Sequence, residues 1–288
     1  MSTTRVEQLA REVTVRREPR KRWTRFILPG YSALFMLYLA FPILVIVLFS
    51  FNDSDVGFGT APRVKTTWFG FTTAWYGRVF EIPDLTEALQ HSLLIAFTSS
   101  FAAAGLGALI GLALARYRYR GKATTDFVVF LGISSPEVVL GAALALYFVT
   151  LGVARGLTTL FVSHVMFSIP FVAVTVRARA AGLDRSLEDA AMDLGAGPFV
   201  TFFKVTLPLI LPGILAGWLL AFALSMDDFV ISNFVQGPAT MFPTWVYGAT
   251  RVGIPPHVFV FATFIFLGGL TLAGIYALTR LRAAKTTT

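Results

Sequence analysis

The chain lacks cysteine and carries little charge. None of its 288 residues is Cys, and Asp, Glu, Lys and Arg together make up only 14% of them. Without cysteine, a disulfide framework, a thiol nucleophile and a Cys-ligated zinc site are all excluded. His91 and His164 belong to no cluster with the spacing of metal ligands, so we expect no metal centre. We expect His164 to be a packed, hydrogen-bonded residue.

A phosphate-binding loop is also missing. The pattern G-x-x-x-x-G-K-[ST] does not occur. The only Gly-Lys pair, Gly121-Lys122, is followed by Ala123 and has no upstream glycine at the required spacing. The chain therefore has no means of its own to bind and hydrolyse ATP, and we expect it to bind no cofactor.

Apolar residues dominate what is present. Hydrophobic residues make up 56% of the chain, and the mean hydropathy is +0.71, which is too high for a soluble domain of this size. A helix needs about 20 apolar residues to cross the hydrocarbon layer of a bilayer. Six runs qualify, and they predict an all-α polytopic membrane protein: Phe26 to Phe51, Ser92 to Ala115, Phe127 to Gly152, Leu157 to Val176, Leu209 to Met226 and Val258 to Thr279.

The positions of the basic residues predict the orientation. With the N-terminus in the cytoplasm, most Lys and Arg lie on the cytoplasmic side, as the positive-inside rule requires. The exceptions are Arg63, Lys65, Arg78, Arg155 and Arg251. We therefore expect both termini inside, with a basic tail over residues 1–25, a short tail over 284–288, an outside loop over 52–91 and a five-helix core over 92–283.

The net charge of +8 does not indicate a nucleic-acid partner. The basic run Arg17 to Arg25 directly precedes the first apolar run, where contact with anionic lipid is a sufficient explanation. A cleavable signal peptide is the alternative reading of this end. However, the apolar run is longer than a signal core and no small-residue cleavage site follows it, so we expect a retained span.

Two local patterns predict packing rather than chemistry. The outside loop contains Trp68, Trp75 and Tyr76, a density of aromatic residues typical of the membrane interface, although an extracytoplasmic partner could also dock there. In the second run, Gly107 and Gly111 are four residues apart, so they place small residues on one helix face. We expect another helix to approach closely there.

A polar segment between the fourth and fifth runs differs from the rest of the chain. In SLEDAAMDLG, Ser186 and Asp189 have the spacing of a capping box, and Gly195 is typical of a helix end. The helix between them would carry one shallow apolar stripe, made of Leu187, Ala190, Ala191 and Leu194. The segment Gly195 to Pro198 then breaks the helix before a second one begins.

Three interpretations of this segment are possible: a simple connector, a helix on the lipid surface, and a helix that docks on a protein. Helices on the lipid surface usually present Lys and Arg, whereas this one carries Glu188, Asp189 and Asp193. A small apolar stripe flanked by acids is better suited to the groove of another subunit.

The segment resembles the cytoplasmic motif of permease subunits in binding-protein-dependent ABC importers. That motif reads E-A-A, three residues, G, nine residues, I-x-L-P. The matching residues here are Asp189, Ala190, Ala191, Gly195, Val205, Leu207 and Pro208, with Glu188 directly before them. Asp replaces Glu and Val replaces Ile, and both changes keep the charge or the shape. The resemblance implies a type I importer permease fold in which residues 184–206 form the coupling loop to an ATPase.

Other segments narrow the resemblance to the spermidine/putrescine branch: QHSL at 90–93, RYRYRGK at 116–122, SSPEVVLG at 134–141 and SMDDFVISNFVQGP at 225–238. The family implies a second permease subunit, two ATPase subunits that hold ATP and Mg²⁺, and an extracytoplasmic binding protein, in a bacterial cytoplasmic membrane. A permease for another small polar or cationic solute is the alternative.

Three acids stand where acids are costly. Glu137 follows Pro136 inside the third run, and Asp227 and Asp228 follow the fifth. Carboxylates in a membrane usually mark a pathway, and they can replace the water that a polycation loses. We therefore expect these three to line the substrate pathway. The alternatives are a structural hydrogen bond for Glu137 and a simple water-interface position for the Asp pair.

Two functions of other classes remain open from the residues alone. A secondary transporter or channel could use Glu137 as an ion relay and would need no ATPase. An intramembrane hydrolase would need a catalytic constellation, and the buried acid has no evident partner in the sequence.

Overall fold

The computed structural model describes residues 24–53 and 68–285. Residues 1–23, 54–67 and 286–288 lie outside the described part. Most of the expected basic tail, part of the outside loop and the end of the C-terminal tail therefore fall outside it. The chain divides into two compact units: one contains residues 1–55, 66–77 and 256–288, and the other contains residues 56–65 and 78–255.

In the described residues the chain is helical, apart from one isolated bridge between Asn52 and Phe71. The first unit contains α2 (Thr24–Phe49), α3 (Ala74–Gly77) and α13 (Pro256–Lys285). Its aromatic residues fold onto the end of α2: the indole nitrogen of Trp75 donates to the carbonyl of Asn52 (3.0 Å), and the hydroxyl of Tyr76 lies 2.7 Å from that of Ser50. These two aromatics of the expected interfacial belt are thus used in packing.

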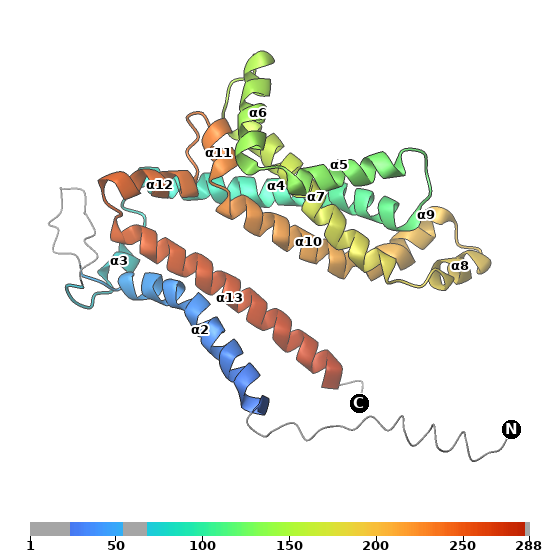
Figure 1. Ribbon diagram of the computed structural model, residues 1–288, viewed down its shortest axis with the longest axis horizontal. Coiled ribbons are helices and arrows are strands. Elements are labelled where there is room, and N and C mark those ends of the chain that lie inside the picture. The colour runs from blue at the N-terminus through green and yellow to red at the C-terminus, as the bar shows by residue number, and fades with distance from the viewer. Residues whose placement is uncertain (1–23, 54–67, 286–288) are drawn as a thin grey trace. The chain divides into compact units, whose positions relative to one another are not determined.

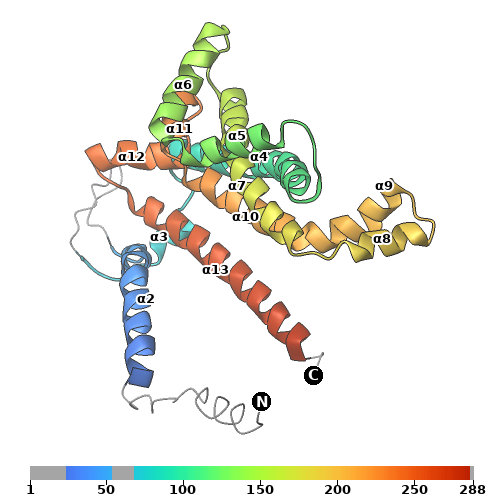
Figure 2. The same cartoon turned by 45° about the vertical axis from the view of Figure 1, so that its right-hand side comes forward.

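The second unit contains the remaining helices: α4 (Pro83–Arg116), α5 (Lys122–Ser134), α6 (Glu137–Thr150), α7 (Leu157–Ala181), α8 (Ser186–Asp193), α9 (Pro198–Thr201), the π-helical turn η1 (Phe202–Thr206), α10 (Leu207–Asp227), α11 (Val230–Val235) and α12 (Phe242–Val252). In both views α8 and α9 lie at one end of this unit, while α11 and α12 lie at the other (Figures 1 and 2).

The core of the second unit is formed where α4, α7 and α10 meet. Ala103 of α4, Val172 and Val176 of α7 and Ala221 of α10 form one buried apolar cluster. The glycine stripe of α4 faces α7, as predicted: a Cβ at Gly107 would lie 2.7 Å from the Cβ of Val172, and the corresponding position at Gly111 meets the α7 backbone. Small residues therefore let these two helices approach closely.

The third apolar run does not form the single helix that we expected. It is divided at Ser135 and Pro136 into α5 and α6, which are bent by 106° relative to each other. Pro136 has no amide hydrogen and disfavours a helical conformation at the residue before it, so the break occurs there. Glu137 is therefore the first residue of α6 and does not lie within one straight helix.

Other boundaries also differ from the expected ones. The helix α4 begins nine residues before the expected second span, at Pro83, within the segment assigned to the outside loop. The expected fifth span, Leu209 to Met226, is the later part of a longer helical run, Pro198–Asp227.

Helices long and apolar enough to cross a bilayer are fewer among the described residues than the six runs expected. By length and composition four qualify, at Ile27–Phe49, Pro83–Arg116, Leu157–Ala181 and Pro198–Asp227, and the bent pair α5 and α6 is a fifth candidate. The described apolar part of α13, Pro256–Thr271, is shorter than a full span. The chain is thus a multi-pass helical membrane protein.

Candidate functional site

The polar segment forms the short helix that the sequence predicted, and it ends at the predicted residue. Gly195 has a φ of +85°, the left-handed conformation that glycine adopts easily. Its amide donates to the carbonyl of Met192 (2.9 Å), and the amide of Ala196 donates to that of Ala191 (3.0 Å). These two bonds constitute a Schellman motif, which satisfies the last carbonyl groups of α8 and stops the helix.

The start of α8 differs from the predicted capping box. Ser186 is the first helical residue rather than the cap, and its amide donates to a carboxylate oxygen of Asp184 (3.0 Å). This bond, together with the hydroxyl of Ser186 and the charge of Arg116, holds the pKa of Asp184 below its ordinary value. Asp184, which the sequence analysis did not single out, therefore anchors the first turn.

The apolar stripe of α8 has little cover from the rest of the chain. Leu194 is 90% exposed and Leu187 is 47% exposed, and Ala190 is also exposed. Two large apolar side chains farther along the loop, those of Phe199 and Phe203, are exposed as well. A short helix with an exposed apolar stripe between acids is a surface suited to a protein partner.

The carboxylate of Glu188 is bound within the chain. Its Oε1 accepts a hydrogen bond from the hydroxyl of Thr206 (2.9 Å) and lies 3.6 Å from Nη2 of Arg116. Arg116 is the last residue of α4, and its carbonyl accepts a hydrogen bond from the guanidinium of Arg185. We call Glu188, Arg116 and Thr206 the Glu188 cluster. The side chain of Asp189, by contrast, is exposed and bonds to no other described residue.

The remaining motif residues lie where the loop enters α10. Val205 is in η1, and Leu207 and Pro208 begin α10. The amide of Leu207 donates to the carbonyl of Phe202, five residues back, which is the bond of a π-helical turn. Pro208 cannot donate an amide hydrogen, so a wider turn directly before it costs little.

Asp228 and Asp227 have opposite environments. Asp228 is buried, and its carboxylate accepts hydrogen bonds from the amides of Ile231 (3.1 Å) and Ser232 (2.7 Å), so it caps α11. His164 also lies beside it, with Nδ1 2.7 Å from the hydroxyl of Ser225 and Nε2 3.0 Å from that of Ser232. The prediction that His164 is packed and hydrogen-bonded is confirmed. Asp227 is exposed.

Glu137 is also exposed, and it lies in the first turn of α6. The positive end of the helix dipole favours a carboxylate at this position. The helix α6 packs against α11: a Cβ at Gly141 would lie 2.7 Å from the ring of Phe234, and Leu144 shares a buried cluster with Ile231. The fold thus brings α6, which begins with Glu137, against α11, which follows Asp227 and Asp228.

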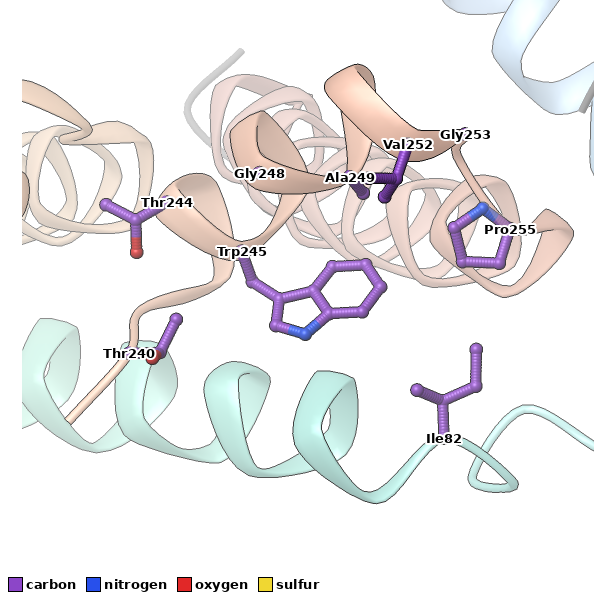
Figure 3. A pocket seen from close by; sticks show the side chains of 9 residues that line it. All are labelled: Ile82, Thr240, Thr244, Trp245, Gly248, Ala249, Val252, Gly253 and Pro255. Carbon is purple, nitrogen blue, oxygen red and sulfur yellow. The ribbon is translucent and has the colours of Figure 1, made fainter. Parts of the chain in front are cut away.

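A separate cavity of about 590 Å³ lies between α12 and the start of α4 (Figure 3). The indole of Trp245 points from α12 toward Ile82. The cavity is lined by Ile82, Thr240, Thr244, Trp245, Gly248, Ala249, Val252, Gly253 and Pro255. None of these side chains is charged, so the cavity is poorly suited to a polycation.

The sequence did not indicate which residues contact Glu188 and Asp228. Arg116 and Thr206 contact Glu188, and Arg185 donates to the carbonyl of Arg116. Ser232 bonds to Asp228, and Ser225 bonds to His164 beside it. The one available signal was that Arg116 ends an apolar run at the start of RYRYRGK, a position at which a cation favours the helix end.

Comparison with known proteins identifies the family of the chain. Residues 106–284 match the family described as "Binding-protein-dependent transport system inner membrane component". The spermidine/putrescine transport system permease protein PotC of Escherichia coli (strain K12) is 39% identical over 249 residues, which cover 86% of this chain and 91% of PotC. The putrescine transport system permease protein PotI of the same strain is 41% identical over 248 residues, 83% of this chain and 85% of PotI.

Among solved structures, a chain of a bacterial ABC transporter involved in the import of the acidic polysaccharide alginate is similar with a TM-score of 0.63. The match covers 90% of this chain and 96% of that one at 16% identity, and it supports the fold alone. The family match includes the whole of α8, the Glu188 cluster and the acids beside α6 and α11. On these grounds the chain belongs to the inner membrane components of binding-protein-dependent transport systems.

Proposed function

We propose that the chain is the permease subunit of an ATP-driven polyamine importer, in which it forms half of the translocation pathway. The observation that carries this proposal is its 39% and 41% identity, over most of its length, to permeases named for spermidine and putrescine transport. Six spans with both termini in the cytoplasm of a bacterium remain our expected topology. Three basic residues, Arg116, Arg177 and Arg185, lie in the helices and the loop at the α8 end of the second unit. Because basic residues favour the cytoplasmic side, this supports a cytoplasmic position for α8.

The proposed partners follow from the family and from the exposed surface of α8. A second permease subunit would complete the pathway, and an extracytoplasmic binding protein would deliver the substrate. Two ATPase subunits would hold ATP and Mg²⁺, and one of them would dock on the stripe of α8 and its acid Asp189. The residues of this chain would contribute the docking surface and the pathway, and no step of ATP hydrolysis.

We propose that the exposed carboxylates of Glu137 and Asp227 line the substrate pathway and contact the polyamine. A polyamine is a flexible polycation, and separated carboxylates can replace part of its lost hydration. Asp228 is less suited to direct contact, because its carboxylate already accepts three hydrogen bonds and is buried. It would shape the pathway by fixing the start of α11.

Reconstitution tests the proposal. The chain, its partner permease, the ATPases and the binding protein are assembled in lipid vesicles, and uptake of labelled spermidine and putrescine is measured with and without ATP. We expect uptake only in the complete system with ATP. Uptake by the chain alone would instead indicate a secondary transporter or channel. ATP-dependent uptake of another solute, with no polyamine uptake, would support the alternative substrate.

A further inference from the structure

Two neighbouring acids of α8 differ in their partners. The carboxylate of Glu188 is held by Thr206 and Arg116, whereas that of Asp189 is exposed. Both acids belong to the coupling segment, but only Asp189 is directed so that a docked subunit can reach it without first breaking contacts within the chain. The two acids therefore have different roles.

The Glu188 cluster connects three parts of the second unit. Glu188 is in α8, Arg116 is the last residue of α4, and Thr206 is the last residue of η1, directly before α10. A further bond, from the guanidinium of Arg185 to the carbonyl of Arg116, joins the start of α8 to the same end of α4. A single carboxylate thus links the surface helix to two long helices of the core.

The pairing of Arg116 is incomplete in this conformation. Its side chain is only 8% exposed, yet its Nε has no hydrogen-bond partner among the described residues. The distance of 3.6 Å from Nη2 to Glu188 is longer than the 2.7–2.9 Å or so of a charged hydrogen bond. Burying an incompletely paired charge costs stability, so packing alone is a weak reason for this arrangement. A small shift of α8 would allow a closer pair.

We propose that the Glu188 cluster passes displacement of α8 to α4 and α10, and that Glu188 and Arg116 are positioning residues rather than contacts to the ATPase. The inference rests on the proposed function, in which an ATPase moves α8. When α8 is displaced, the bond to Thr206 pulls on the start of α10 and the charge pair pulls on the end of α4. Without the cluster, α8 would move relative to the core.

The test compares variants of the assembled importer in lipid vesicles. Glu188→Gln removes the charge and keeps the shape, Thr206→Val removes the hydroxyl donor, and Arg116→Gln removes the cation. ATP hydrolysis, spermidine uptake and retention of the ATPase subunits are measured together. We expect each variant to retain the ATPases and to hydrolyse ATP, while the uptake per ATP falls about fivefold or more, as for a lost coupling between two sites.

Two further variants separate coupling from general damage. The double variant Arg116→Gln with Glu188→Gln is expected to be no worse than either single variant, because both remove the same pair. Arg116→Lys keeps the charge, so we expect its uptake per ATP to be closer to that of the unaltered complex than that of Arg116→Gln. The matched control is Thr201→Val, because Thr201 lies in the same loop and its buried hydroxyl has no hydrogen-bond partner among the described residues, so we expect the uptake per ATP to be unchanged.

An unchanged uptake per ATP in both Glu188→Gln and Thr206→Val would overturn the inference. So would an equal loss in Thr201→Val, or a double variant whose defect is the product of the single ones. If Arg116→Gln fails to assemble, Glu188→Gln and Thr206→Val decide the matter, since both nearly preserve shape. Failure of the unaltered complex to couple uptake to ATP would instead contradict the proposed function itself.

Discussion

Nε2 of His164 lies 3.5 Å from Oδ2 of Asp228, and the two side chains are 1% and 2% exposed. The contact joins α7 to the residue that caps α11, and the hydroxyls of Ser225 and Ser232 complete the surroundings. A buried polar network of this kind is stabilising only while its members remain paired. The acid pair at the end of α10 is therefore divided into a structural residue and an exposed one.

The first prediction concerns this division. Asp228→Asn places an amide where the amides of Ile231 and Ser232 need acceptors, so we expect a loss of about 1–3 kcal/mol in stability. Asp227→Asn should leave stability unchanged and reduce uptake at low polyamine concentration. Stability is measured by thermal unfolding of the purified complex, monitored by intrinsic fluorescence. Uptake is measured from its kinetics. Equal loss of stability in both variants would contradict the division.

Glu137→Gln tests the second pathway acid. A hydrogen bond to a charged group contributes about 1.5–3 kcal/mol, so we expect the polyamine concentration for half-maximal uptake to rise about tenfold. Asp84→Asn is the matched control, because Asp84 is also exposed in the first turn of a helix, α4. Both changes lose the same helix-dipole interaction, and only Glu137→Gln should alter uptake. If uptake and selectivity are unchanged in Glu137→Gln and in both Asp variants, the pathway hypothesis is wrong.

The contact between α4 and α7 gives a prediction about stability. Gly111→Ala adds a methyl group against the backbone of Ala173 and Arg177, and overpacking of this kind costs about 1–3 kcal/mol. Gly105→Ala is the control, since a Cβ there meets nothing within 4 Å and alanine favours the helix. We expect a lower midpoint of thermal unfolding only in Gly111→Ala. A similar fall in both variants would mean that helix packing does not set the need for glycine at residue 111.

The exposed stripe of α8 predicts where the ATPase binds. Ala190→Arg places a long cation on the shallow apolar stripe, so we expect the ATPase subunits to be lost on purification while the permease itself stays folded. Ala190→Ser changes the volume little and should retain them. Quantification of the ATPase in affinity-purified complexes gives the readout, and full retention in Ala190→Arg would place the docking surface elsewhere.

Asp184 gives a prediction about pH. Because its pKa in the folded chain is lowered by the amide and hydroxyl of Ser186, the ionised form anchors α8 at neutral pH. That contribution is present above the ordinary pKa of Asp, about 3.9, and is lost as the pH falls through the lowered value. Asp184→Asn should therefore exchange the amide hydrogens of α8 faster at neutral pH, as measured by mass spectrometry. The difference from the unaltered chain should disappear only in acid, and its absence at neutral pH would contradict the capping role.

Local features of the site were predictable from the sequence. The end of α8 at Gly195 and its apolar stripe depend on neighbouring residues, and both were predicted correctly. The start of α8 was not, because the N-cap position is Arg185 and the amide of Ser186 bonds to the carboxylate of Asp184, two residues before it. The third run was expected to form one helix, and although Pro136 accounts for the break, the bend of 106° depends on what α5 and α6 pack against.

By itself, the sequence determined that the chain is a helical membrane protein and that one polar loop carries a short helix with an apolar stripe, because apolar length and short-range spacing suffice for both. Only the tertiary structure decided which acids remain available to a partner or a substrate. Glu188 and Asp228 are bound by residues from distant segments, Arg116 and His164, while Asp189 and Asp227 beside them are exposed. The environment of a carboxylate is set by the helices that pack around it, and that packing is not encoded in any one local pattern.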